Sequence, residues 1–94
     1  MSGVLKVYIT STTGSREIRN NQQRVEMILT GKKIDVEYID ISSDDSKKEE
    51  MRKIGEDDKL LPPQFVRGEK YLGGFDQFDE AVESGELKQF LLIE

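Results

Sequence analysis

A run of small hydroxyl-bearing residues, Ser11-Thr12-Thr13-Gly14-Ser15, separates a strand-like stretch from a helix-like stretch of this chain. In small α/β proteins the first strand-to-helix turn is a common place for a reactive thiol or a phosphate cradle. This turn lacks the spacing of a nucleotide-binding loop, and its serines have no histidine to activate them. We therefore expect no catalytic residue here, and a helix N-cap with satisfied hydroxyls is the favoured interpretation.

The composition narrows the possible chemistry further. The 94 residues include no cysteine and no histidine, which excludes disulfides, thiol catalysis and imidazole acid–base catalysis, so we expect neither a metal site nor another cofactor. A formal net charge of −5 without a basic stripe argues against a nucleic-acid partner. The chain shows no signal-peptide pattern and no apolar run long enough to span a membrane. We expect a single domain, residues 1–94, that is a cytoplasmic monomer with the nucleus as a second location.

The segment Leu61-Pro62-Pro63-Gln64 precedes a predicted strand and has three open interpretations. X-Pro bonds adopt the cis form more readily than other peptide bonds, and a cis Pro62–Pro63 bond would leave flanking backbone groups free to pair with an extended peptide. A rigid strand entry without a ligand fits the spacing equally well. A polyproline ligand for SH3 or EVH1 domains is the third interpretation, although a second proline three positions away is missing.

The segment Gly73-Gly74-Phe75-Asp76 opens a predicted helix. Glycines allow close approach of the backbone to a ligand, and the first N–H groups of a helix are unpaired and favour anions. Asp76 therefore has two interpretations. It caps the helix, or it holds the ammonium group of a ligand whose carboxylate binds the helix N–H groups.

The hydrophobic pattern predicts the elements that position these segments. Strands are expected over 4–10, 34–41, 60–66 and 71–73, and helices over 16–31, 45–55, 75–84 and 86–93. Within the first helix, Ile18, Val25, Ile28 and Leu29 fall on one face. The order β-α-β-α-β-β-α-α predicts a parallel crossover followed by an antiparallel hairpin. The fold class is thus α/β, a four-stranded mixed sheet flanked by helices, with the partly polar strand 34–41 at or near an edge.

These segments together resemble a thioredoxin-fold domain of the glutaredoxin type along the whole chain. The strand–turn–helix opening, the proline before the third strand and the Gly-Gly-x-Asp start of the next helix follow the order of that family. More closely, the chain resembles the SH3-domain-binding glutamic-acid-rich-like proteins, in particular their short like-protein-3 branch. The residues that carry this resemblance are Met1-Ser2-Gly3, Val7-Tyr8, Thr12-Thr13-Gly14-Ser15-Arg16-Glu17-Ile18, Gln22-Gln23, Asp40-Ile41-Ser42, Glu50-Met51-Arg52, Pro62-Pro63-Gln64 and Tyr71.

The resemblance implies a thioredoxin-like fold with the remains of a glutathione cleft. Glutaredoxins carry C-x-x-C or C-x-x-S in the turn that is Ser11-Thr12-Thr13-Gly14 here, so the nucleophile is absent, and a hydroxyl does not replace a thiolate. The cleft would be lined by this turn, by the proline loop with a cis bond before Pro63, and by the start of the next helix. The implied ligand-binding residues are Thr12, Thr13, Gly14, Leu61, Pro62, Pro63, Gln64, Gly73, Gly74, Phe75 and Asp76.

The chain departs from the branch at positions that bear on function. Leu72 replaces a cysteine of that branch, and Gly74 brings the segment closer to the Gly-Gly of glutaredoxins. Leu60-Leu61-Pro62-Pro63 lacks the first proline of the P-L-P-P-Q motif, and no glutamic-acid-rich tail is present. We therefore expect no enzyme but a redox-inactive adaptor or modulator that binds unidentified protein partners. The alternative is non-catalytic binding of glutathione or a γ-glutamyl peptide in the vestigial cleft.

Overall fold

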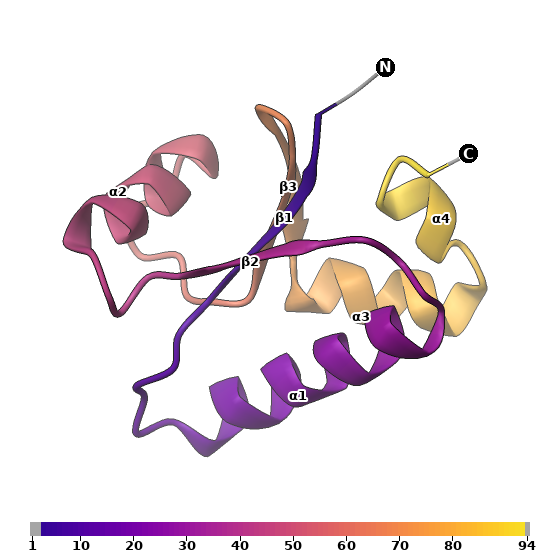
Figure 1. Ribbon diagram of the computed structural model, residues 1–94, viewed down its shortest axis with the longest axis horizontal. Helices are drawn as coiled ribbons and strands as arrows, with labels where there is room; N and C mark the ends of the chain where they lie inside the picture. Colours follow the sequence, from indigo (N-terminus) through magenta and orange to yellow (C-terminus); the bar gives the residue numbers. More distant parts are fainter. Residues whose placement is uncertain (1–2, 94) are drawn as a thin grey trace.

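The computed structural model describes residues 3–93, and its helices and strands follow one another in the order that the sequence pattern predicts (Figure 1). The α/β fold class and the β-α-β-α-β-β-α-α order are confirmed. No helix within this part of the chain is long and apolar enough to cross a membrane. The elements are β1 (Leu5–Ile9), α1 (Arg16–Gly31), β2 (Glu37–Asp40), α2 (Asp45–Ile54), β3 (Gln64–Arg67), β4 (Lys70–Gly74), α3 (Phe75–Ser84) and α4 (Leu87–Phe90).

The four strands form one mixed sheet in the order β2-β1-β3-β4. Strand β1 is parallel to β2 and antiparallel to β3, and β3 is antiparallel to β4. The register pairs Tyr8 with Gln64 and Gln64 with Gly74. The end of β1, the start of β3 and the end of β4 therefore meet at one end of the sheet. The predicted edge position of the second strand is confirmed.

Three predicted strands are shorter in the structure, and β1 loses one residue at each end, Val4 and Thr10. Strand β2 begins at Glu37, because the chain first leaves α1 through a turn in which the N–H of Ile34 donates to the carbonyl of Leu29 over 2.9 Å. Strand β3 begins at Gln64 instead of the predicted Leu60. The intervening prolines have no N–H to donate to a strand ladder, so the preceding loop cannot join the sheet.

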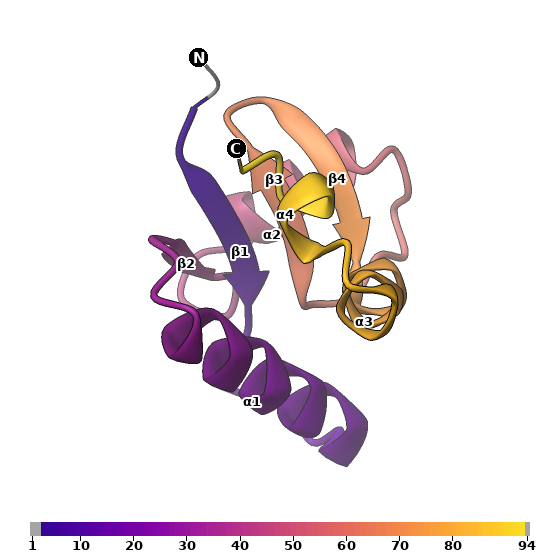
Figure 2. The same ribbon diagram turned by 90° about the vertical axis from the view of Figure 1, so that its right-hand side faces the viewer.

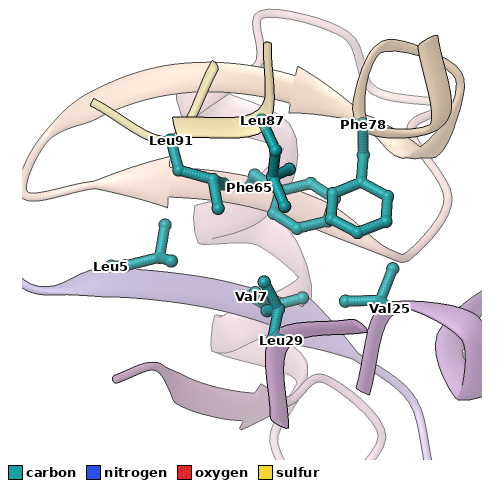
Figure 3. Close-up of a cluster of buried hydrophobic side chains, with 8 residues drawn as sticks. All are labelled: Leu5, Val7, Val25, Leu29, Phe65, Phe78, Leu87 and Leu91. Carbon is teal, nitrogen blue, oxygen red and sulfur yellow. The ribbon is translucent and has the colours of Figure 1, made fainter. Parts of the chain in front are cut away.

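The larger core lies between one face of the sheet and the helices α1, α3 and α4 (Figure 3). Side chains alternate along a strand, so Leu5 and Val7 of β1 point to this face together with Phe65 of β3. The ring of Phe65 stacks on that of Phe78 with 4.9 Å between the ring centroids. The core residues are Leu5, Val7, Val25, Leu29, Phe65, Phe78, Leu87 and Leu91.

Helix α2 covers the other face of the sheet (Figure 2). The smaller core beneath it contains Tyr8, Ile41, Met51 and Val66, all of them buried. Because β1 and β3 contribute to both cores, each face of the central strands is covered by helices. This arrangement leaves the ends of the sheet as the places where loops reach the surface.

Candidate functional site

The first strand-to-helix turn is held by hydrogen bonds among its own residues. The Oγ of Ser15 accepts from the N–H of Ile18 over 3.2 Å, which confirms the predicted N-cap of α1. The Oγ1 of Thr13 accepts from the N–H of Ser15 over 3.1 Å. The guanidinium of Arg19 donates to the carbonyl of Thr13 over 2.9 Å. The hydroxyls of Thr13 and Ser15 are thus engaged locally, as the N-cap interpretation expects.

A second anchor of the turn comes from Gln22 on α1, to which the sequence analysis assigned no role. Its Oε1 accepts from the N–H of Thr10 over 2.8 Å, and its Nε2 donates to the carbonyl of Thr10 over 2.9 Å. The sequence did carry a signal for this contact. Gln22 comes four residues after Ile18 and three before Val25, so it lies on the apolar face of the helix. A polar residue at such a position requires a buried polar partner.

Ser11 stands where the resemblance places the reactive thiol, and the carboxylate of Asp40 contacts it. The N–H of Ser11 donates to Oδ1 of Asp40 over 3.1 Å, and its Oγ lies 3.0 Å from the Oγ of Ser42. Both the N–H and the Oγ of Ser42 donate to the same carboxylate oxygen. Hydrogen bonds from Ser11 and Ser42 hold the pKa of Asp40 well below its usual range. This part of the turn therefore already binds an anion supplied by the chain itself.

The proline loop has the predicted cis bond between Pro62 and Pro63, and both rings are buried. Burial of the two prolines disfavours the polyproline interpretation, because SH3 and EVH1 domains bind exposed proline rings. The side chain of Leu61, in contrast, is 58% exposed. Within residues 3–93 its N–H has no hydrogen-bond acceptor. An extended peptide has one free backbone donor to pair with here.

The carbonyl of Leu61 is already occupied by a buried side chain. The Nε2 of Gln64 donates to it over 2.8 Å, and the Oε1 of Gln64 accepts from the hydroxyl of Tyr71 over 2.5 Å. Gln64 is only 6% exposed, so both ends of its amide are paired inside the protein. This network fixes the start of β3 from the α2 side of the sheet, and it leaves Gln64 with little reach toward an external ligand.

The glycine pair is explained by packing inside the protein. A Cβ at Gly74 would lie 2.9 Å from Nε2 of Gln64, and Gly73 has φ +145°, where side chains are strained. The N–H of Gly74 donates to Oε1 of Gln77 over 2.9 Å. The cap interpretation of Asp76 is wrong, because Gln77 makes the side-chain contact at the start of α3 while the side chain of Asp76 is exposed to solvent.

The first turn, the proline loop and the glycine pair meet at the same end of the sheet. The register pairs Tyr8 with Gln64 and Gln64 with Gly74, and these residues lie next to or within the three segments. Neither of two surface cavities, one at the opposite end of the sheet and one between α3 and α4, is lined by any of them. The cleft itself therefore stays a prediction. Thr12, Gly14, Leu61 and Asp76 are exposed, Thr13 and Phe75 are half-buried, and Pro62, Pro63, Gln64, Gly73 and Gly74 are buried. This end of the sheet offers groups that can bind a peptide, and it has no thiol.

Comparison with known proteins places the chain in a family. The family model described as "SH3-binding, glutamic acid-rich protein" matches residues 3–94. The SH3 domain-binding glutamic acid-rich protein homolog of Drosophila melanogaster is 37% identical over 102 residues, which cover 96% of this chain. The chain spans 65% of the length of that relative.

Solved structures with the same fold include proteins of two kinds. The actin interacting protein Aip5 of C. albicans matches with a TM-score of 0.75 and 23% identity, covering 94% of this chain and 87% of that chain. A complex of buckwheat glutaredoxin with glutathione matches with a TM-score of 0.68 and 19% identity, covering 94% of this chain and 76% of that chain. At these identities the likeness shows the fold alone. The chain belongs to the SH3-binding, glutamic acid-rich protein family and combines a glutaredoxin-like fold with a complete lack of cysteine.

Proposed function

We propose that this chain is a non-catalytic adaptor, which binds an extended segment of a protein partner at the end of the sheet where Leu61 is exposed. The observation that carries this proposal is the contact between Ser11 and Asp40. The position that carries the nucleophilic cysteine in glutaredoxins holds a serine here, and the N–H of this serine binds the internal carboxylate of Asp40. The hydroxyl of a serine has neither the low pKa nor the redox chemistry of a thiolate.

The exposed backbone beside the prolines supports binding of a peptide. Leu61 presents a 58% exposed apolar side chain and an N–H without an acceptor within residues 3–93. Its neighbours Pro62 and Pro63 are buried, so the segment is fixed to the body of the protein. Peptides that add to such an extended segment gain affinity from backbone hydrogen bonds and specificity from side-chain contacts.

The absence of redox turnover is tested with a coupled assay, in which glutathione reductase and NADPH report reduction of hydroxyethyl disulfide by glutathione. The wild-type chain is expected to give the same rate as a blank without protein. A rate that rises in proportion to the concentration of the chain would overturn the non-catalytic part of the proposal.

The binding surface is tested by comparing two charge substitutions at exposed apolar residues. Leu61→Asp is expected to lose the partner that the wild-type chain captures by crosslinking in cell extract. Met27→Asp is the matched control, because Met27 is 69% exposed on α1 and lies on a different element. Equal capture by the wild-type chain and by Leu61→Asp would show that the partner binds elsewhere.

Binding of glutathione or a γ-glutamyl peptide is the second candidate function. The free N–H of Leu61 favours it, because an extended peptide of any length can pair with this donor. A backbone amide NMR titration with reduced glutathione tests it. Saturable shifts at Thr12–Gly14, Leu61 and Asp76, weakened by Asp76→Ala, would support this function. Unchanged spectra at millimolar glutathione would exclude it and leave the protein adaptor.

A further inference from the structure

A wide groove lies at the opposite end of the sheet from Leu61. The register pairs Leu5 with Arg67 there, where β1 begins and β3 ends. The groove has a volume of about 1490 Å³, and its walls come from the chain that follows α1, from the residues just before β1, from the end of β3 and from α4 with the residues after it. Figure 2 shows α4 beside the start of β1 at this end.

The groove is positively charged although the chain as a whole is acidic. The formal net charge of the chain is −5. Among residues 3–93, the groove walls nevertheless carry four cationic side chains and a single carboxylate, that of Asp35. The cationic residues are Lys32, Lys33, Arg67 and Lys88. Such a local excess of positive charge attracts an anionic partner to this one place.

Within the part of the chain that the structure describes, the groove cations have no carboxylate partner. Elsewhere Arg24 pairs with Asp79 over 2.8 Å, which ties α1 to α3. Among residues 3–93, in contrast, none of the four groove cations forms an ion pair. The guanidinium of Arg67 donates to the carbonyl of Leu91 over 2.7 Å and to that of Gly3 over 3.0 Å. These neutral acceptors hold it in place without cancelling its charge.

Apolar side chains lie between these charges. Val4 is 59% exposed and Leu92 is 40% exposed, although both are apolar and line the groove. Ile34 and Ile93 line it as well and are half-buried. The groove therefore offers an apolar surface bordered by cations, which matches a ligand that carries both carboxylates and an apolar group.

We propose that this groove binds an acidic peptide segment with an apolar anchor residue. Its carboxylates pair with Lys32, Lys33 and Lys88, and its anchor packs between Val4 and Leu92. The cations come from the chain after α1, the end of β3 and α4, so a ligand that contacts them all must extend across the groove, which favours a segment of several residues. A concave site favours a peptide over a flat lipid surface, and a nucleic acid would extend beyond the groove onto the acidic remainder of the protein.

The test is a fluorescence anisotropy titration of the full chain with a labelled probe peptide of sequence Glu-Glu-Leu-Phe-Glu-Glu. Saturable binding is expected, and Lys32→Glu combined with Lys88→Glu should weaken it by about tenfold or more. The matched control combines Lys48→Glu with Lys59→Glu, which makes the same charge change at exposed positions outside the groove. The control should keep the wild-type affinity, and circular dichroism checks that both variants are folded.

Two further probes separate the contributions of charge and apolar contact. A peptide with glutamine in place of glutamate should not bind detectably, and one with glycine in place of Leu-Phe should bind about tenfold more weakly. Absence of binding by the Glu-Glu-Leu-Phe-Glu-Glu peptide, or equal weakening of its binding by both lysine pairs, would overturn the proposal. Binding of phosphatidylserine vesicles but not of the peptide would overturn it in favour of a lipid surface. Leu61→Asp should leave the peptide affinity unchanged, because Leu61 lies at the other end of the sheet, so this proposal can fail independently of the proposed function.

Discussion

The side chain of Gln22 completes the end of β1 by bonding to both backbone groups of Thr10. Its amide accepts from the N–H over 2.8 Å and donates to the carbonyl over 2.9 Å, as a neighbouring strand would. Thr10 is only 9% exposed, so water has little access to these groups. Gln22 on α1 thus fixes the backbone of Thr10, the residue that precedes the first turn.

Gln22→Ala is expected to lower the free energy of unfolding by about 2–3 kcal/mol, because it leaves a buried donor and a buried acceptor without partners. Gln23→Ala is the matched control at the adjacent exposed position, and it should change stability by less than about 0.5 kcal/mol. Urea titration followed by circular dichroism measures both values. Similar losses for the two variants would contradict the role assigned to Gln22.

Gly74→Ala is expected to destabilise the protein by about 1–3 kcal/mol, because its Cβ would approach the amide of Gln64 within 2.9 Å. That amide cannot move aside freely, since it bonds to both Leu61 and Tyr71. Gly14→Ala is the control, because no atom lies within 4 Å of a Cβ there. Its stability should match that of the wild-type chain in the same denaturant titration.

A double-mutant cycle with Gln64→Ala identifies why Gly74→Ala destabilises the protein. In the Gln64→Ala background the clashing amide is absent, so Gly74→Ala should cost clearly less than it does in the wild-type chain. Equal costs in the two backgrounds would mean that the glycine is required for some reason other than its contact with Gln64.

Most of the fold was predictable because its signals are local. The periodic apolar residues of α1, its Ser15 cap and the element order each depend on residues close together in the chain. The shortened strands were less predictable, since the extent of a strand depends on which neighbour it pairs with. The prolines before β3 carried a signal against a strand beginning at Leu60, because their missing N–H groups exclude pairing.

The candidate site was predictable in its location but only in part in its contacts. The hydroxyls of Thr13 and Ser15 in the first turn behave as a local cap pattern predicts. The contact between Ser11 and Asp40 joins residues 29 positions apart, and no spacing rule connects them. The groove cations likewise come from segments distant in sequence, from Lys32 to Lys88, and only the folded topology brings them together. Gln22 is the exception, since its place on an apolar helix face was visible.

Two methionines provide a direct test of the packing. Met51 on α2 is 1% exposed within the smaller core, whereas Met27 on α1 is 69% exposed. Met51→Ala is expected to cost about 2–5 kcal/mol because it removes buried contacts and leaves a cavity. Met27→Ala should stay within about 0.5 kcal/mol of the wild-type chain. Thermal unfolding of the two variants measures both effects. A larger loss of stability for Met27→Ala would show that the face of α1 that carries Met27 is buried.

The carboxylate of Asp40 makes the stability of the first turn depend on pH. Hydrogen bonds from Ser11 and Ser42 lower its pKa in the folded protein below the ordinary value of 3.8. The folded state therefore favours the ionised form, and this stabilisation is complete above the unfolded-state pKa and is lost as the pH falls through the folded-state pKa. Asp40→Asn removes the titration, so it should be less stable than the wild-type chain near neutral pH.

The stability gap between the wild-type chain and Asp40→Asn should narrow as the pH falls from about 5 to about 3, because Asp40 takes up a proton in the unfolded chain while hydrogen bonds still keep it ionised in the folded chain. Urea titrations at several pH values measure the gap directly. Asp58→Asn is the control, since Asp58 is exposed in a loop and its carboxylate accepts no hydrogen bond within residues 3–93. Its gap to the wild-type chain should stay nearly constant. A constant gap for Asp40→Asn as well would mean that the carboxylate of Asp40 gains nothing from Ser11 and Ser42, and that the first turn does not hold an anion.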